Sequence, residues 1–195
     1  FATCSDNRTR NGSARIANSN NYGSTYQKRL VVSGVVADDY DTFGNDTIGI
    51  FKKNEKYGYY NTKKKSIVIP AKYENAWRFS EGLAGVIMNG KLGFINIKDE
   101  TVIGFIYGYH ESHLYEFVYR WGHCAVPNEK GLCGIIDKNG KWVIKPIYEL
   151  ANVASANYAI VNVKNGFKIQ IDYNGNILNP HVIDEVERLT YTKNI

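Results

Sequence analysis

The sequence predicts an all-β fold assembled from tandem repeats, and three observations support this prediction. The 195 residues include 15 Tyr and 18 Gly but only 4 Pro and 1 Met, and Tyr, with Val, Ile and Thr, suits a pleated sheet. Four Asn-Gly pairs, from Asn89 to Asn174, lie between apolar or alternating runs, which is a strong hairpin signal. Finally, similar segments recur about every 35 residues.

The first 25 residues differ from the rest of the chain. After Cys4 they are rich in Asn, Ser, Arg and Gly, so they cannot bury enough apolar surface to offset chain entropy. We expect a flexible polar tether over residues 1–25 and a folded domain over residues 26–195. Phe1-Ala2-Thr3-Cys4 resembles the end of a bacterial lipoprotein signal, which implies a lipid on Cys4. The alternative is an incidental thiol.

Four segments of the folded region align with one another, beginning at Asn54, Asn89, Lys130 and Asn165. Each opens with a turn pair, reaches an Asn or Asp at a strand end, and continues through a second turn into an apolar strand. Three of the segments carry a Gly in the middle of the first strand, namely Gly58, Gly93 and Gly134. In three of them the last strand contains a Pro, namely Pro70, Pro146 and Pro180. We expect both residues of each Asn-Gly turn to have positive φ.

The spacing of the segments shows where the chain departs from the repeat. Glu55 and Gly90 are 35 residues apart, Gly90 and Gly131 are 41 apart, and Gly131 and Gly166 are 35 apart. The second unit therefore carries an insertion, within residues 105–122. About four units would form a curved or barrel-like array of β-meanders, in which stacked units build the core. A small closed propeller-like ring is the alternative.

These segments resemble the tryptophan–glycine (WG) repeat of bacterial proteins. The pattern F-x-E-G-L-A followed by an N-G turn and K-W-G matches two stretches, Phe79–Ala84 and Asn89–Gly93. Leu92 replaces the Trp there, Tyr57 replaces it in the first unit and Cys133 in the third, so the copies are divergent. The resemblance covers roughly residues 48–184 and implies a β-repeat module.

Two further structural expectations follow from the repeat. A Gly in a strand marks a bulge or a close approach, and we expect it to leave room for an aromatic side chain of the next unit. Cys124 and Cys133 flank one turn, and in the register we favour they lie diagonally on one face, too far apart for a disulfide. We therefore expect two buried free thiols, with a disulfide as the alternative.

Composition and motifs give little support for catalysis or nucleic-acid binding. The net charge of +5 is mixed along the chain, and the densest basic run, Lys63–Lys65, fits a solvated hairpin tip. Neither nucleophile-elbow nor phosphate-loop nor dinucleotide-binding motifs occur. His110 and His113 lack the spacing of a zinc protease, so we expect no metal and no cofactor. Weaker alternatives pair Cys133 with His123, or Glu81 with Glu116, as catalytic groups.

Aromatic side chains give the stronger functional signal, because Tyr and Trp are favoured at binding hot spots. The insertion is rich in them, and we expect it to form the contact surface. The predicted binding residues are Trp77, Tyr107, Tyr109, His110, His113, Tyr115, Tyr119 and Trp121.

The sequence thus predicts a non-catalytic interaction or scaffolding module. Its expected location is the bacterial cell envelope, as an outer-membrane or cell-surface lipoprotein, with a secreted or periplasmic protein as the alternative. The expected partner is a protein of an envelope or membrane complex, and the membrane is contacted only through the lipid. A carbohydrate or cell-wall binding module is the alternative function, and an enzyme with its site in the insertion is the third.

Overall fold

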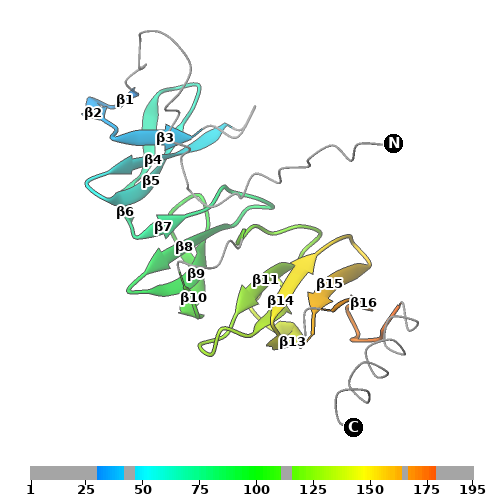
Figure 1. Ribbon diagram of the computed structural model, residues 1–195. Coiled ribbons are helices and arrows are strands. Elements are labelled where there is room, and N and C mark those ends of the chain that lie inside the picture. The colour runs from blue at the N-terminus through cyan, green and yellow to red at the C-terminus, as the bar shows by residue number, and fades with distance from the viewer. Residues whose placement is uncertain (1–29, 42–46, 111–115, 164–166, 179–195) are drawn as a thin grey trace, which may run out of the picture.

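A computed structural model describes residues 30–41, 47–110, 116–163 and 167–178. Cys4, His113, Tyr115 and the Asn165-Gly166 turn lie outside the described residues. Within the described ranges the chain forms strands and turns but no helix (Figure 1), which confirms the all-β prediction. The strands make five antiparallel sheets that follow one another in chain order.

A two-stranded ribbon comes first, formed by β1 (Val31–Val32) and β2 (Val35–Val36). The other four sheets are meanders, in which each strand pairs with the next one along the chain. Sheet 1 contains β3 (Asp39–Asp41), β4 (Ile48–Lys53), β5 (Lys56–Asn61) and β6 (Ser66–Tyr73). Sheet 2 contains β7 (Asn75–Ala76), β8 (Ala84–Met88), β9 (Lys91–Ile95) and β10 (Thr101–Tyr107). Sheet 3 contains β11 (Cys124–Pro127), β12 (Cys133–Ile136) and β13 (Trp142–Tyr148). Sheet 4 contains β14 (Leu150–Val153), β15 (Tyr158–Asn162) and β16 (Lys168–Asp172).

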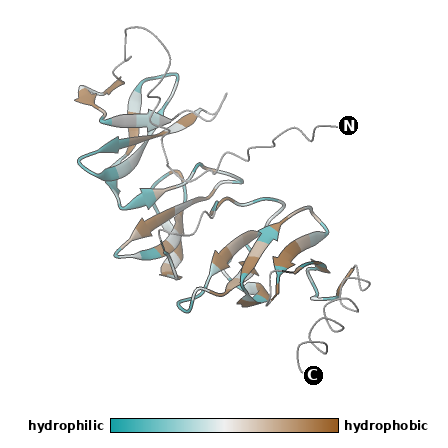
Figure 2. Cartoon of the chain, in the orientation of Figure 1, coloured by the Kyte–Doolittle hydropathy of each residue, from teal (hydrophilic) through white to brown (hydrophobic). Residues whose placement is uncertain are grey.

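The sheets lie in an open curved row (Figure 1), and the described residues close into neither a barrel nor a ring. One apolar cluster runs through sheets 2, 3 and 4, and a second joins sheets 1 and 2. The ribbon covers Phe51 and Tyr60 of sheet 1 with Leu30 and Val32. In Figure 2 the apolar segments lie in the ribbon of β1 and β2 and within the strands of sheets 2 to 4. Each sheet therefore shelters the apolar face of its neighbour, as the repeat predicts.

Sheet 3 shows what this packing does to a central strand. All four residues of β12 are buried, because neighbouring sheets cover both of its faces. Cys124 and Cys133 are both buried and free, as expected. The register pairs Cys124 with Ile136 and Cys133 with Pro127, so alternation along the strand puts the two thiols on opposite faces. The expectation that they share a face is wrong.

The same bulge recurs at the end of sheets 1, 2 and 3. Tyr57 and Tyr59 are two residues apart on β5, but their partners Tyr73 and Ile69 are four apart on β6. The pairs β9–β10 and β12–β13 show the same two-against-four register. Pro70 and Pro146 lie inside these bulges, where the missing N–H costs no ladder hydrogen bond.

The mid-strand glycines lie opposite these bulges. A Cβ atom on Gly58 would be 2.6 Å from the Ile69 carbonyl oxygen, and one on Gly134 would be 2.8 Å from the Pro146 nitrogen. At Gly93 the neighbour is the Phe105 ring of β10, at 2.8 Å. The close approach is therefore real, but it involves the last strand of the same sheet. The expected aromatic of the next unit is not there, because the bulge folds the strand's own residues over the glycine.

The turns divide into two kinds. At Asn89-Gly90 both residues have positive φ, 52° and 70°, as expected for a two-residue hairpin loop. At Asn139-Gly140 and Asn174-Gly175 only the glycine does, with φ of 77° and 89°, so the expectation was wrong for these two. The reason is an aspartate before each turn. Asp137 Oδ1 accepts the N–H groups of Asn139 and Lys141, and Asp172 Oδ1 accepts those of Asn174 and Asn176, which widens both loops.

Candidate functional site

Three of the predicted binding residues are buried. The Trp77 ring packs edge-on against Phe117, with ring centroids 4.6 Å apart. The Tyr107 hydroxyl donates to the Gly140 carbonyl at 2.6 Å, and the Tyr119 hydroxyl donates to the Asp137 carbonyl at 2.9 Å. Burial raises the pKa of Tyr107 to about 12. These side chains pack within the array and are not available as an exposed surface.

Trp121 is different, because it is 51% exposed at the tip of the turn Arg120–His123. Its φ is 50° and that of Gly122 is 77°, and a positive φ is unusual for a bulky side chain. Sheet 2 has the same turn before its second strand, with Glu81 at φ 50° and Gly82 at φ 89°. Trp121 therefore occupies the position that Glu81 occupies in sheet 2.

The two turns are joined to each other. The Gly122 N–H donates to Glu81 Oε2 at 3.0 Å. Lys138 Nζ donates to the Glu81 carbonyl at 3.0 Å and lies 3.1 Å from its carboxylate. Burial alone would raise the pKa of Glu81, but the Lys138 ammonium and the Gly122 amide hold it below its usual value. The backbone that carries Trp121 is thus fixed by a charged group of the preceding sheet.

A second aromatic pair lies beside this turn. The His123 ring stacks on Tyr173 with centroids 3.9 Å apart and an interplanar angle of 7°. Nδ1 of His123 is 2.8 Å from the Trp121 carbonyl oxygen, and the Tyr173 hydroxyl donates to the Ser155 carbonyl at 2.8 Å. We call Trp121, His123 and Tyr173 together the turn surface. The sequence pattern missed Tyr173, because a stack between sheets 3 and 4 leaves no periodic signal.

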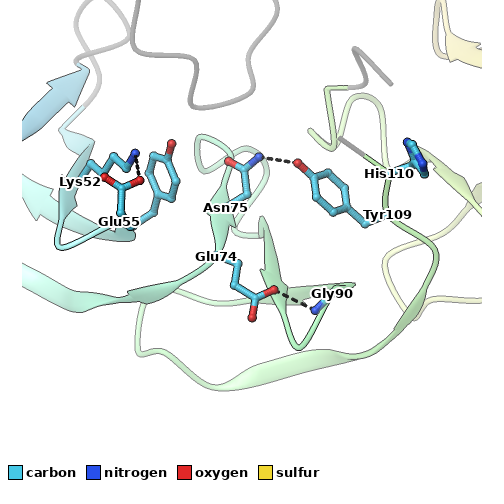
Figure 3. A pocket seen from close by; sticks show the side chains of 8 residues that line it. Lys52, Glu55, Glu74, Asn75, Gly90, Tyr109 and His110 are labelled. Carbon is cyan, nitrogen blue, oxygen red and sulfur yellow. Dashed lines mark hydrogen bonds and ion pairs between the residues drawn. The ribbon is translucent and has the colours of Figure 1, made fainter. Parts of the chain in front are cut away.

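A polar groove of about 780 Å³ lies elsewhere on the molecule (Figure 3). Two predicted residues, Tyr109 and His110, line it. The full lining is Lys52, Glu55, Tyr57, Glu74, Asn75, Gly90, Tyr109 and His110. The turn at Asn54, the turn at Asn89 and the segment after β10 therefore meet here, bringing sheets 1 and 2 together with the start of the insertion.

The charged groups of the groove are paired with groups beside them. Lys52 Nζ is 2.6 Å from the Glu55 carboxylate. The Glu74 carboxylate accepts the N–H groups of Asn89 at 3.1 Å and Gly90 at 2.8 Å, and Lys56 Nζ is 3.9 Å away.

Neutral groups continue the lining beyond these charges. Asn75 Nδ2 donates to the Tyr109 hydroxyl at 2.9 Å, and in Figure 3 Asn75 lies between Glu55 and Tyr109.

The turn surface and the groove are at opposite ends of the strands. β8 starts just after the turn of Glu81, which contacts the turn surface, and it ends at the turn of Asn89 and Gly90, which lines the groove. Five residues of extended strand span roughly 16 Å at about 3.3 Å per residue. The two candidate sites can therefore be changed independently.

Two observations concern metal and thiol chemistry in the described residues. Among them, no group of three or more His, Cys, Asp or Glu side chains could hold a metal ion. Burial raises the pKa of the Cys124 thiol well above its usual value, which disfavours the reactive thiolate. In the same part of the chain, no helix is long and apolar enough to span a membrane.

Successive meanders that cover one another's apolar faces define an all-β repeat protein. The family described as "WG containing repeat" matches two stretches of the sequence, residues 57–91 and 134–166. These two stretches therefore match the WG repeat, which confirms the resemblance seen in their turns and glycines. A comparison with curated proteins found no match.

Several solved structures have a partly similar arrangement of strands. The computationally designed Ika8 protein is 9% identical over 71% of this chain and 46% of its own, with a TM-score of 0.49. KlHsv2 with loop 6CD replaced by a Gly-Ser linker is 12% identical over 72% and 51%, with a TM-score of 0.46. The WD40 β-propeller domain of Doa1 is 9% identical over 76% and 55%, with a TM-score of 0.41. This chain thus spans about half the length of each.

Proposed function

We propose that this protein is a non-catalytic interaction module that binds a protein partner through the turn surface. One observation carries the proposal: Trp121 is 51% exposed at a backbone position of φ 50°. Trp is enriched among the residues that dominate binding energy at interfaces. Because Glu81 has the same φ in the equivalent turn, the turn sets the backbone conformation, and the large exposed side chain is what distinguishes this position.

The surroundings of Trp121 support the same proposal. Sheet 2 has Glu81 at this turn position, so the fold does not require an aromatic residue there. The bonds from Gly122 and Lys138 to Glu81 hold the turn in place before any partner arrives. A preorganised contact loses less entropy on binding.

The substitution Trp121→Glu tests the proposal, because it copies the residue of the equivalent turn. We expect it to weaken partner binding by at least about 30-fold, the loss typical of an interface hot spot, with unchanged thermal unfolding. The measurement is cross-linked affinity capture from the source cells, followed by titration of the recovered partner. The matched control is Ile147→Glu, at an apolar residue that is 65% exposed in sheet 3. Equal partner recovery by wild type and Trp121→Glu would disprove the proposal.

A deletion of residues 107–121 would be a poorer test. That segment contains Phe117, Val118 and Tyr119, which are all buried in the cluster shared by sheets 2 to 4. Its removal would unfold the neighbouring sheets, so a loss of partners could not be assigned to the surface.

We further propose that the module is held at a bacterial envelope by a lipid on Cys4, where it meets a partner of an envelope or membrane complex. The support is the resemblance of Phe1–Cys4 to a lipoprotein signal and the polar stretch that follows it. Secretion or residence in the periplasm is the alternative. Cys4→Ser should move the protein from the membrane fraction to the soluble fraction, and an unmodified Cys4 peptide in a mass spectrum would contradict the anchor.

A further inference from the structure

We infer that the groove between sheets 1 and 2 is a second binding site, and that its ligand is a neutral oligosaccharide. This inference does not depend on the turn surface, since the groove lies at the other end of the strands. Its volume of about 780 Å³ is within the range of small-molecule sites, about 300–1,000 Å³. Three features of the lining select the ligand: its charge, its side-chain types and its hydrogen-bonding groups.

The charge of the lining favours a neutral ligand. Lys52 is paired with Glu55, and Glu74 is held by two main-chain N–H groups with Lys56 nearby. The lining itself contains one lysine and two glutamates, and Lys56, 3.9 Å from Glu74, supplies the second cation from just outside it. With Lys56 counted, the positive and negative charges balance, which leaves no surplus charge for a phosphate, a carboxylate or an amine. A charged ligand would have to break a pair or lose hydration without compensation.

The side-chain types favour hydroxyl-rich molecules. The lining contains neither Leu, Ile, Val, Met nor Phe, so it lacks the apolar pocket that anchors a hydrophobic peptide side chain. The rings of the lining are those of Tyr57 in sheet 1 and of Tyr109 and His110 after β10. Lys52 Nζ lies 5.6 Å from the centroid of the Tyr57 ring, so Tyr109 is the ring on which we base the inference. A ring offers an apolar face with a polar edge, which matches a sugar ring with its C–H face and its equatorial hydroxyls.

The hydrogen-bonding groups are arranged to serve such a ligand. The Tyr109 hydroxyl accepts from Asn75, which leaves its own proton to donate to a ligand oxygen. The two Glu74 oxygens each accept a main-chain N–H, and each keeps a lone pair for one of two neighbouring hydroxyls. The Glu55 side chain is 86% exposed, so it can accept a further hydroxyl at the rim.

The Tyr109 ring is also fixed from behind. It packs edge-on against Trp77 and Phe117, with centroids 6.0 Å and 6.4 Å away. Because both neighbours are buried, this wall of the groove is rigid, which lowers the entropy lost on binding.

The test begins with an immobilised array of neutral, amino-sugar and uronic-acid oligosaccharides. We expect a neutral oligosaccharide to bind, and calorimetric titration of that sugar to give the same Kd from about 50 to 500 mM NaCl, because screening acts on charged pairs. Tyr109→Phe keeps the packed ring and removes one hydroxyl, so it should weaken binding roughly threefold to tenfold. Glu55→Ala should weaken it severalfold without touching the core.

Trp121→Glu is the matched control, since it changes the opposite end of the strands and should leave the sugar affinity unaltered. This variant separates the two sites. If Trp121→Glu loses the protein partner but still binds the sugar, the groove remains assigned as a separate sugar site. The inference is overturned if no neutral oligosaccharide binds, if only acidic sugars bind, or if Tyr109→Phe and Glu55→Ala both bind as the wild type does.

Discussion

Tyrosine hydroxyls connect consecutive sheets at the scale of single residues. The Tyr59 hydroxyl of sheet 1 donates to the Trp77 carbonyl at 2.8 Å, and that of Tyr73 donates to Asp99 in a turn of sheet 2 at 2.5 Å. Tyr107 of sheet 2 reaches Gly140 in the corresponding turn of sheet 3. Many tyrosines of the sequence therefore pack between sheets and are not free for a binding surface. Whether a given tyrosine is buried or exposed depends on whether the neighbouring sheet covers it.

Gly134 supplies the first prediction at this scale. A Cβ there would meet the backbone of the β13 bulge, with the Pro146 nitrogen at 2.8 Å, so Gly134→Ala should destabilise the protein by about 1–3 kcal/mol. Gly104→Ala is the control, because its nearest neighbour would be the Ile106 side chain at an ordinary 3.8 Å. Urea unfolding measures both, and equal midpoints for the two variants would contradict the close approach.

The capped turn is the recurring device at the scale of the elements. In several turns an Asn or Asp side-chain oxygen accepts two main-chain N–H groups from the residues that follow it. The residues with this role are Asn61, Asn96, Asn128, Asp137 and Asp172. Most of these residues were visible in the sequence, as the Asn or Asp that recurs at a strand end in each aligned segment. What it could not show was that this cap, and not the Asn-Gly pair, sets the turn geometry at Asn139.

Asp137 gives the prediction for this element. Asp137→Ala removes both acceptors and should cost about 1–2 kcal/mol, whereas Asp137→Asn keeps an acceptor oxygen, as in the other turns, and should cost less. Urea unfolding at neutral pH distinguishes them. Equal losses for the two variants would show that the charge matters more than the cap.

Asp137 also gives a pH dependence. Partial burial would raise its pKa, but the N–H groups of Lys141 and Asn139 hold it below the usual 3.8. A lowered folded pKa contributes stability above the unfolded value of about 3.9, and this contribution is lost as the pH falls through the folded pKa. The free energy of unfolding should therefore fall with acid below about pH 4, and less steeply in Asp137→Asn. If the free energy of unfolding fell as steeply with acid in Asp137→Asn as in the wild type, the role of the Asp137 carboxylate in this pH dependence would be contradicted.

The whole molecule is held together by apolar surface shared between sheets. Along β8, alternate side chains serve different neighbours: Ala84 and Val86 belong to the cluster with sheet 1, and Ile87 to the cluster with sheets 3 and 4. Period-two alternation of a strand buried on both faces produces this division. Sheets 2, 3 and 4 should consequently lose their structure together.

Ile135 of β12 tests this cooperativity. It is fully buried in the shared cluster, so Ile135→Ala should cost about 2–5 kcal/mol. Amide hydrogen exchange should then show faster exchange in β9 and β15 as well as in β12. The control is Ile147→Ala, at an exposed residue of the same sheet, with an effect within about 0.5 kcal/mol. Faster exchange confined to sheet 3 would argue against a common core.

The sequence by itself determined the fold class, the repeat and the positions of most turns. These features depend on local chemistry: glycine at positive φ, Asn or Asp beside free amides, and strand-forming residues between them. The tertiary structure alone decided which aromatics are exposed, that Cys124 and Cys133 face apart, and that Trp121 and the groove lie at opposite ends of the strands. Those facts depend on register and on which sheet covers which face, and both are set by contacts between residues far apart in the chain.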